Sequence, residues 1–369
     1  MNKMGFGLLR LPQAGRHSAG GPGGFDWPLI TRMTDAFLDL GGKYFDTCYT
    51  YLNGYSEMAV KKCLSERVPR ERFLAADKLP GYMCRSRQDA VKYFEEELRR
   101  CGVDYFDVYM LHWLNEAHYR KAEQLDQFGF LEKMKKEGKA VKTGFSYHDS
   151  AALLDEILGQ HPEIDVVQLQ INYLDWDTAG IESGKCYETA VRHGKQVYVM
   201  EPVKGGSLAN LPSEAMALLQ SVHPDRTAAD WALRFVQSLP GVEICLSGMN
   251  TIEQMQANMQ PVEPLSEAER ELLFRAAGII LANTRIPCTG CGYCVSHCPE
   301  NIAIPDFFKM YNELCRYPEE SWKIEPVYRQ KCRQHGKASQ CIGCGSCARH
   351  CPQNIRIPEY LKKVADAFE

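Results

Sequence analysis

The chain has no long hydrophobic run. An apolar stretch of about eighteen residues marks a helix that can cross a bilayer, and none occurs among the 369 residues. The N-terminus, from Met1 to Leu11, also lacks the apolar core and small-residue cleavage site of a secretory signal. We therefore expect a protein of the reducing cytoplasm, with no membrane-spanning helix and no structural disulfides.

An excess of charge of either sign is also missing. The sequence has 43 Lys and Arg residues against 47 Asp and Glu residues, a formal net charge of −4. Proteins that bind nucleic acids or anionic membranes usually carry a clear basic excess, so neither partner is expected. A basic run at Arg329, Lys331, Arg333 and Lys337 could receive an acidic redox partner such as a ferredoxin, although a solvated loop is the simpler interpretation.

A glycine-rich dinucleotide turn is absent after the first predicted strand. The early glycines, at positions 15, 20, 21, 23 and 24, come late, behind Pro12 and mixed with His17 and Pro22. This composition predicts a mobile loop. An open doubly wound sheet would need Gly-x-Gly-x-x-Gly directly after that strand, so this fold is only the second choice.

Cysteine, by contrast, is abundant, with sixteen residues. Eight of them form two copies of one pattern, Cys288-x2-Cys291-x2-Cys294-x3-Cys298-Pro299 and Cys341-x2-Cys344-x2-Cys347-x3-Cys351-Pro352. In bacterial ferredoxins three closely spaced thiolates hold one [4Fe–4S] cluster, and the fourth, followed by proline, reaches the other cluster. The pattern therefore predicts two [4Fe–4S] clusters. One is expected on Cys288, Cys291, Cys294 and Cys351, and the other on Cys341, Cys344, Cys347 and Cys298.

Structural zinc is the alternative for these cysteines, but zinc sites usually consist of two Cys-x2-Cys pairs with a longer spacer. The other eight cysteines, at positions 48, 63, 84, 101, 186, 245, 315 and 332, show no ligand spacing. Most of them are expected to be small buried hydrophobic residues.

The first 260 residues alternate short β-branched or aromatic runs with amphipathic stretches, the pattern of a parallel sheet covered by helices. Eight such units predict a closed (β/α)8 barrel. The expected strands are Gly5–Leu9, Tyr44–Asp46, Phe73–Lys78, Phe106–His112, Val141–Ser146, Val166–Gln170, Val197–Glu201 and Val242–Ser247. We expect the barrel to span residues 1–262, a linking helix 263–284, and a small, mainly helical ferredoxin-like domain 285–369.

Four polar residues follow neighbouring predicted strands at the barrel end where active sites lie. Asp46 ends the second strand, Tyr51 follows five residues later, Lys78 ends the third strand and His112 ends the fourth. Each alone would be unremarkable, since such residues usually pack or are solvated. Their joint placement suggests a site.

The chain resembles the aldo/keto reductase family, in particular its subgroup with a C-terminal two-cluster ferredoxin domain. The resemblance covers nearly the whole chain and rests on motifs in family order. These are Asp46-Thr47-Cys48-x-x-Tyr51, Lys78-Leu79, Leu111-His112, Gly138-Lys139, Gly144-Phe145-Ser146, Gln168, Asn172-Tyr173, Glu201-Pro202 and Gly248, Gln254 and Asn258. It implies an oxidoreductase that interconverts a small carbonyl and its alcohol with NAD or NADP. Asp46, Tyr51, Lys78 and His112 match the catalytic tetrad.

The chemistry of these side chains agrees with that assignment. Reducing a carbonyl by hydride needs a proton donor at the oxygen, and a free phenol, with a pKa of about 10, holds its proton too tightly. Lys78 would lower the pKa of Tyr51, Asp46 would hold Lys78, and His112 would orient the substrate oxygen. Tyr49 and Tyr55 are nearby alternatives, and the family spacing selects Tyr51.

The resemblance also implies cofactor contacts. Ser146 and Gln168 would hold the nicotinamide carboxamide, although simple hydrogen bonding at strand ends would explain them too. Gly205 and Gly206 would approach the pyrophosphate, and Gln254 and Asn258 would lie at the adenosine end. Met200 stands where many members have an aromatic residue under the nicotinamide. Met249 and Asn250 stand where an Arg or Lys often binds the 2′-phosphate, which leaves NAD, NADP and a different redox cofactor all open.

The expected barrel site and the expected iron–sulfur domain transfer different numbers of electrons, because nicotinamide moves two electrons as hydride and each cluster moves one. Three hypotheses follow. The clusters exchange electrons with the barrel site, they serve as a scaffold or redox sensor beside an ordinary reductase, or the protein is a non-enzymatic electron carrier whose barrel only binds a nucleotide.

Overall fold

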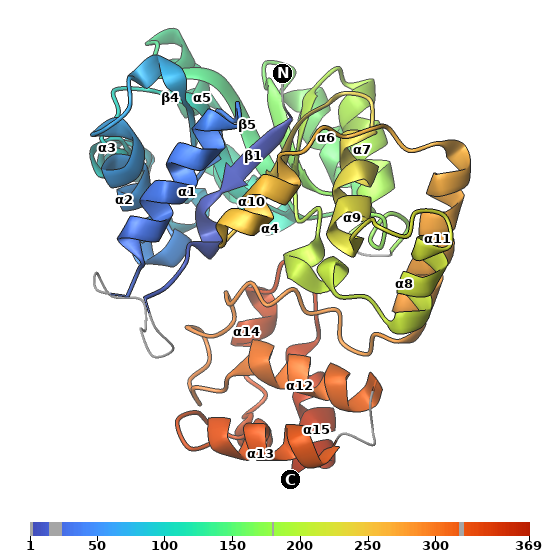
Figure 1. Ribbon diagram of the computed structural model, residues 1–369. Helices are drawn as coiled ribbons and strands as arrows, with labels where there is room; N and C mark the ends of the chain where they lie inside the picture. The colour runs from blue at the N-terminus through green and yellow to red at the C-terminus, as the bar shows by residue number, and fades with distance from the viewer. Residues whose placement is uncertain (1–2, 15–23, 179–180, 317–320) are drawn as a thin grey trace. The chain divides into compact units, whose positions relative to one another are not determined.

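The computed structural model describes residues 3–14, 24–178, 181–316 and 321–369 (Figure 1). The chain divides into two compact units. The first comprises Met1–Pro202 and Ala232–Leu265, and the second comprises Val203–Trp231 and Ser266–Glu369. Glycines 15, 20, 21 and 23 of the predicted mobile loop lie outside the described residues.

The first unit is built on a closed barrel of parallel strands in sequence order from β1 to β8. The strands are β1 (Met4–Gly7), β2 (Tyr44–Asp46), β3 (Leu74–Leu79), β4 (Phe106–Leu114), β5 (Ala140–Tyr147), β6 (Val166–Gln170), β7 (Gln196–Met200) and β8 (Val242–Ser247). Pairing of β1 with β8 closes the barrel. The predicted (β/α)8 fold is confirmed, and an open doubly wound sheet is excluded because no strand of this sheet is left at an edge.

Helices follow the strands and cover the outside of the barrel (Figure 1). They are α1 (Trp27–Asp39), α2 (Tyr55–Val60), α3 (Arg87–Cys101), α4 (Glu116–Gln124), α5 (Gln127–Lys136), α6 (Ala151–Gln160), α7 (Ser183–Arg192), α9 (Ala228–Gln237) and α10 (Ile252–Asn258). Capping residues begin several of them. Ser86 and Asp89 form a capping box at the start of α3, and Gly102 ends that helix in the left-handed conformation.

Strand alternation sorts the side chains into two layers. Tyr44, Ala76, Val108 and Met110 belong to one buried cluster inside the barrel, together with Tyr198 and other strand residues. Because successive strand residues point to opposite faces, Asp46, Lys78 and His112 continue this inward set at the carboxyl ends of their strands. Asp77 and Tyr109 point outward instead, beneath the helices.

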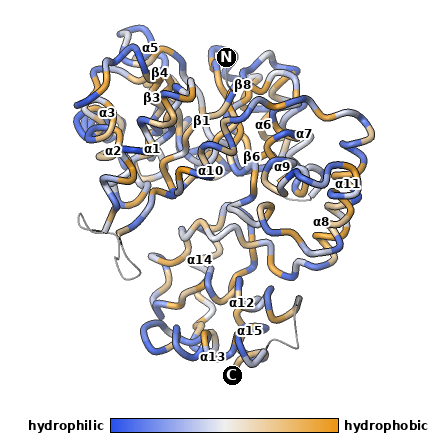
Figure 2. Tube along the Cα trace, in the orientation of Figure 1, coloured by the Kyte–Doolittle hydropathy of each residue, from blue (hydrophilic) through white to orange (hydrophobic). Residues whose placement is uncertain are grey.

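The second unit is helical. It contains α8 (Ser213–Gln220), α11 (Glu267–Ala282), α12 (Ile304–Arg316), α13 (Ser321–Lys331), α14 (Ser346–Arg349) and α15 (Ile357–Phe368). Helices α8 and α11 pack on each other, and α12 packs on α13 and α15. Apolar residues recur along these helices in Figure 2. The core around α12 and α15 includes Ile302, Phe307, Phe308, Leu361 and Val364.

Five predicted strands end differently from expectation. Strand β1 ends at Gly7 rather than Leu9, and β3 and β5 each end one residue later than predicted, at Leu79 and Tyr147. The ends of β4 and β7 differ for a visible backbone reason. Strand β7 stops at Met200, and Glu201 lies outside it with a φ of 57°, a left-handed value that breaks the strand. Strand β4 continues past His112 to Leu114, with Trp113 at a φ of 60° and an irregular register against β5. Nowhere in the described ranges is there a helix with both the length and the apolar character needed to span a bilayer.

Candidate active site and iron–sulfur cavities

A buried ion pair lies inside the rim of the barrel. The Lys78 Nζ donates to Asp46 Oδ1 at 2.6 Å and to the Thr47 carbonyl oxygen at 2.8 Å. Lys78 is completely buried and Asp46 is 3 % exposed. Burial raises the pKa of Asp46, while the Lys78 ammonium and the Gln168 amide oppose that rise. The Lys78 ammonium is thus a positive charge inside the barrel, and its bond to Asp46 fixes its position.

Tyr51 and His112 lie beside this pair. The Lys78 Nζ is 5.1 Å from the centre of the Tyr51 ring, and the rings of Tyr51 and His112 meet edge to face with centres 5.8 Å apart. Tyr51 is half-buried, whereas His112 is 5 % exposed. The structure therefore brings Asp46, Tyr51, Lys78 and His112 together at the carboxyl ends of β2, β3 and β4.

The other two tyrosines of this segment have different environments. The Tyr49 hydroxyl donates to Glu96 Oε2 at 3.1 Å, and the Arg100 guanidinium lies over its ring. Tyr55 packs against Phe25 with ring centres 5.3 Å apart. Neither tyrosine has a recorded ring contact with His112 or Lys78 in the described parts of the chain, so the geometry favours Tyr51.

His112 is held as a neutral imidazole. Burial is the main cause that lowers its pKa well below the usual range, and the charges of Lys78, His148 and His118 add to it. A neutral ring can donate one hydrogen bond from its protonated nitrogen. Its polar neighbour Cys48, whose Sγ lies 3.1 Å from His112 Nδ1, was not predicted from the sequence. Nothing in the cysteine spacing pointed to this contact.

Ser146 and Gln168 are directly opposite each other in the pairing of β5 with β6. Ser146 Oγ accepts a hydrogen bond from the Trp113 backbone N–H at 2.7 Å, which leaves its hydroxyl proton available to donate. Gln168 Nε2 donates to Asp46 Oδ2 at 3.3 Å. Its Oε1 is buried and accepts no hydrogen bond from any residue that the structure describes. A buried acceptor without a donor is what a bound carboxamide N–H would satisfy.

The remaining predicted cofactor residues come from three separate elements of the chain. Met200 ends β7 and packs on the barrel interior. Asn258 Nδ2 donates to Ser247 Oγ at 3.1 Å, at the end of β8, and Gln254 Oε1 accepts from the Asn250 N–H at 2.9 Å. Gly205 and Gly206 have φ values of 63° and 96° in the short helix Lys204–Ala209 of the second unit. Both glycines therefore occupy a left-handed conformation that other residues rarely adopt.

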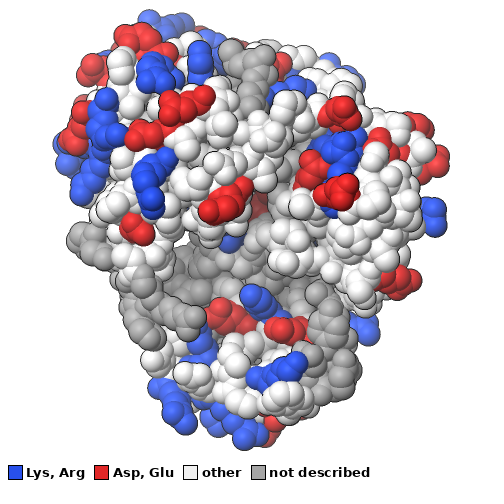
Figure 3. All heavy atoms as spheres, viewed as in Figure 1, with Lys and Arg blue, Asp and Glu red and all other residues white. Residues whose placement is uncertain are grey.

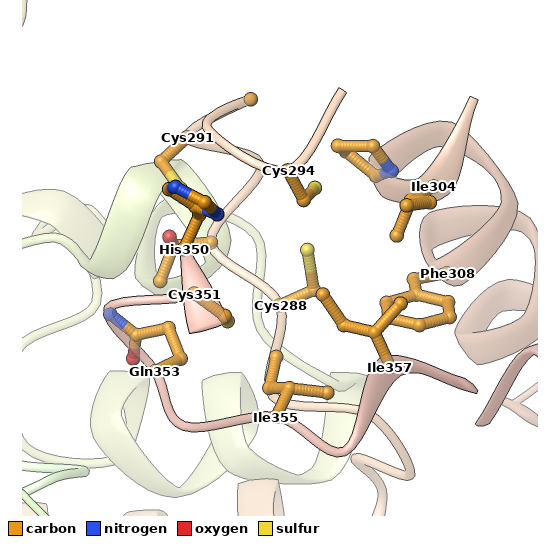
Figure 4. Close-up of a pocket in the computed structure, with 13 residues that line it drawn as sticks. Cys288, Cys291, Cys294, Ile304, Phe308, His350, Cys351, Gln353, Ile355 and Ile357 are labelled. Carbon is orange, nitrogen blue, oxygen red and sulfur yellow. The ribbon is translucent and has the colours of Figure 1, made fainter. Parts of the chain in front are cut away.

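Four cysteines line one cavity in the second unit (Figure 4). They are Cys288, Cys291, Cys294 and Cys351. The space between them has a volume of about 310 Å³, and its lining also includes Ile304, Phe308, Ile355 and Ile357. The first three come from one loop and the fourth from the second copy of the motif. This is the quartet that the spacing predicts for the first cluster.

A second cavity, of about 290 Å³, contains the other quartet. Cys298, Cys341, Cys344 and Cys347 line it, together with Pro299, Pro358 and Leu361. None of the sixteen cysteines is joined in a disulfide. Cysteine quartets around two largely apolar spaces, each partly open to solvent, fit [4Fe–4S] clusters in number, donor type and connectivity.

Charged side chains of both signs are mixed on the visible face of the molecule (Figure 3). This distribution agrees with the small net charge of −4. A surface of mixed sign does not resemble the basic footprint of a nucleic-acid-binding protein.

Comparison with known families agrees with this geometry. The model of the aldo/keto reductase family matches residues 3–273, and that of a 4Fe-4S dicluster domain matches residues 287–355. The chain belongs to the aldo/keto reductase family. It is thus an oxidoreductase of that family with a C-terminal iron–sulfur domain, as the motifs predicted.

Curated aldo-keto reductases are similar to part of the chain. One from Mycolicibacterium vanbaalenii is 29 % identical over 236 residues, which cover 61 % of this chain and 74 % of that protein. Another, from Mycobacterium sp. (strain MCS), is 32 % identical over 118 residues, which cover 31 % of this chain and 38 % of that protein.

Solved structures share the fold of the barrel. The holo form of an aldo-keto reductase from Bacillus halodurans has a TM-score of 0.61 at 24 % identity and covers 74 % of this chain and 91 % of its own. An aldo-keto reductase from Klebsiella pneumoniae in complex with NADPH has a TM-score of 0.58 at 21 % identity and covers 74 % and 90 %.

Proposed function

We propose that the barrel interconverts a small carbonyl compound and its alcohol, with Tyr51 as the proton donor to the carbonyl oxygen. The observation that carries this proposal is the Lys78 ammonium, fixed by Asp46 at 2.6 Å and lying 5.1 Å from the Tyr51 ring centre. A fixed positive charge stabilises the phenolate that remains after the proton has left. This arrangement favours an enzyme over a nucleotide-binding electron carrier, which would not need it.

Each neighbouring side chain has a task in that reaction. Asp46 neutralises and orients Lys78, so that the ammonium need not reorganise as the phenolate forms. His112, neutral and beside Tyr51, is placed to donate a hydrogen bond to the substrate oxygen. In the opposite direction the same Tyr51 oxygen accepts the alcohol proton.

The residues present fit a nicotinamide cofactor. The unpaired Gln168 Oε1 can accept a hydrogen bond from a carboxamide N–H, and the Ser146 hydroxyl can donate one to the carboxamide oxygen. When bound, such a cofactor supplies or takes the hydride at the carbonyl carbon. The NADPH complex of the Klebsiella pneumoniae protein supports this assignment. NAD and NADP remain alternatives, since Met249 and Asn250 carry no charge for a 2′-phosphate.

The test of this assignment is Tyr51→Phe. We expect carbonyl turnover to fall by roughly 10²-fold or more, because the proton donor is lost while the ring is kept. Tyr49→Phe is the matched control and should keep its turnover, since the Tyr49 hydroxyl bonds Glu96. Steady-state rates with reduced nicotinamide and a panel of small aldehydes and ketones measure both. An unchanged rate in Tyr51→Phe would remove Tyr51 from the mechanism.

We further propose that the two cysteine quartets hold two [4Fe–4S] clusters that relay electrons between the barrel site and a one-electron partner such as a ferredoxin. When bound, each cluster moves one electron. The free thiols suit a reducing cytoplasm, where we place the protein. We also keep the expected domain limits, 1–262 and 285–369 with a linking helix 263–284 between them, as a proposal; the family matches cover 3–273 and 287–355.

An electron-relay role and a scaffold role of the clusters predict different paramagnetic resonance spectra. If the clusters relay electrons, reduced nicotinamide together with a productive carbonyl or alcohol should change their paramagnetic resonance signal in anaerobically reconstituted protein. Tyr51→Phe should weaken that change, because it slows the reaction in the barrel. A signal that stays constant under every substrate condition would support the scaffold role.

A further inference from the structure

A second group of ionisable side chains lies outside the barrel wall, beneath α2 and α3. Asp77 points outward from β3, since its neighbour Lys78 points inward. Glu57 of α2 and Cys101 of α3 face it, and one potential ligand atom of each lies within 4.8 Å of the other two. Asp77, Glu57 and Cys101 are each 0 % exposed. No step of the proposed carbonyl reduction uses them.

These carboxylates are only partly compensated. Arg100 Nη1 donates to Glu57 Oε2 at 2.9 Å, but the other oxygen, Glu57 Oε1, is buried and accepts no hydrogen bond from the described residues. Asp77 accepts from the Lys78 backbone N–H at 2.8 Å and from the Cys101 thiol at 3.4 Å. Leaving a carboxylate oxygen buried and unpaired costs several kcal/mol. A further positive charge is therefore required beside Glu57.

Glu97, also fully buried on α3, adds to this requirement. Its Oε2 accepts from the Tyr109 hydroxyl at 2.6 Å, while its Oε1, like Glu57 Oε1, accepts no hydrogen bond in the described structure. Arg100 cannot serve both glutamates fully, because its other nitrogen donates to Glu96.

One distance within the group suits a small tetrahedral metal, and the other ligand atoms lie within 4.8 Å. With Zn–S near 2.3 Å and Zn–O near 2.1 Å, two ligands of a tetrahedral zinc ion stand about 3.6 Å apart. Cys101 Sγ and Asp77 Oδ2 are 3.4 Å apart. Charge favours a cation as well, because two carboxylates and one thiolate carry three negative charges, a divalent ion supplies two positive ones, and Arg100 divides its charge between Glu57 and Glu96. The thiolate excludes magnesium and calcium, which prefer oxygen ligands.

We propose that Glu57, Asp77 and Cys101 form a structural site for one divalent zinc-class ion, which ties α2 and α3 to β3 behind Lys78. On binding, the metal–sulfur bond replaces the Cys101 S–H bond, and that proton, with any carboxyl proton, is released to solvent. No oxidation or reduction takes place. The site is separate from both cysteine quartets and does not depend on the proposed reaction.

Bound protons are the competing source of positive charge. Burial raises the pKa of Asp77 and of Glu57, and Arg100 opposes the rise at Glu57. Protonated carboxyls would need no metal, so the experiment must distinguish a retained ion from retained protons.

The experiment uses full-length, iron-replete protein incubated with zinc sulfate and desalted. Zinc and iron are measured in the same sample, so that zinc in empty cluster sites is recognised by missing iron. We expect about one retained zinc per chain. Its X-ray absorption fine structure should show one sulfur among oxygen ligands, unlike the all-sulfur shell of zinc in a cysteine quartet. Iron-replete protein that keeps no zinc, or zinc with sulfur ligands alone, overturns the proposal in favour of protons.

Two variants locate the ion. Cys101→Ser removes the sulfur ligand and should abolish zinc retention with iron content unchanged. Cys63→Ser is the matched control, since Cys63 is another buried thiol and its recorded partner is Thr31. Retention lost equally in both variants, or in neither, overturns the site. If Cys101→Ser does not fold, the ligand shell of the wild-type protein alone decides the question.

Discussion

The buried Lys78 is the residue on which the chemistry at the rim depends. A fully buried ammonium persists only when a counter-charge and hydrogen bonds compensate it, and Asp46 with the Thr47 carbonyl does so. The same ammonium acts on its other neighbours. In the proposed reaction it would stabilise a phenolate at Tyr51, and it adds to the burial that lowers the pKa of His112.

The neutral state of His112 has a consequence for stability. Burial lowers its folded-state pKa below the unfolded value of about 6.5. Below that pH the unfolded chain binds a proton at this histidine and the folded protein does not, so acidification favours unfolding. The contribution is present above about pH 6.5 and is lost, by up to about 1.4 kcal/mol per pH unit, as the pH falls.

His112→Asn removes this contribution and should flatten the pH dependence. Denaturant unfolding, followed by tryptophan fluorescence between about pH 7.5 and about pH 5.5, compares the variant with the wild type. The stability advantage of the wild type over the variant should shrink toward the acid end. His335→Asn, a change in the second unit, is the control and should leave the pH dependence of the barrel as it is. A pH-independent difference between His112→Asn and wild type would contradict a neutral His112.

At the scale of elements, the pairing of β5 with β6 places Ser146 opposite Gln168. Gly144 lies two residues earlier on β5, where a Cβ atom would come within 2.3 Å of the Val166 carbonyl oxygen. The backbone of β6 thus lies too close to accept any side chain there. Glycine at this position is required by strand packing rather than by backbone conformation.

Gly144→Ala should therefore push the two strands apart. We expect a loss of about 1–3 kcal/mol in unfolding free energy, as for other overpacked sites, and weaker nicotinamide binding because Ser146 and Gln168 move. Gly159→Ala is the control, since nothing lies near its Cβ in α6 and alanine favours helices by up to about 1 kcal/mol. Thermal denaturation and fluorescence titration measure both. Equal unfolding free energies of the two variants would mean that β6 can move away from the new methyl group without destabilising the barrel.

Comparison of the predicted and observed strands shows which strand limits the hydrophobic periodicity can predict. Strands β2, β6 and β8 have the predicted limits, because their apolar residues end where the chain turns. The ends of β4 and β7 were missed, since Trp113 and Glu201 adopt left-handed φ values that their residue types do not suggest. The tetrad positions were accessible through strand-end placement and family spacing. The Cys48 contact with His112 and the acidic group around Asp77 depend on side-chain packing that no spacing records.

At the scale of the whole molecule, each cavity takes its cysteines from both copies of the motif. Cys351 joins the first loop and Cys298 joins the second. Duplicated spacing was sufficient to predict this exchange, because the proline-linked cysteine of each copy has a fixed partner in bacterial ferredoxins. The grouping of Val203–Trp231 with the second unit was not predictable, since it follows from contacts between segments distant in sequence.

Single substitutions should therefore affect the clusters crosswise. Cys351→Ala is expected to impair the cluster of Cys288, Cys291 and Cys294, and Cys298→Ala the cluster of Cys341, Cys344 and Cys347. Iron content and paramagnetic resonance of the reduced protein measure the loss. Cys315→Ala, outside both quartets, should retain the full iron content. If Cys351→Ala disturbed the second quartet alone, the assignment of ligands would have to be reversed.

The exchange of cysteines between the two copies also limits when metal can enter a nascent chain. The ribosome finishes the barrel strands first, then the triplet 288–294, yet the first quartet stays incomplete until residue 351 has been synthesised, and the second until residue 347. If the quartets hold the proposed clusters, their delivery must come after translation of almost the whole polypeptide, when all eight barrel strands have already been synthesised.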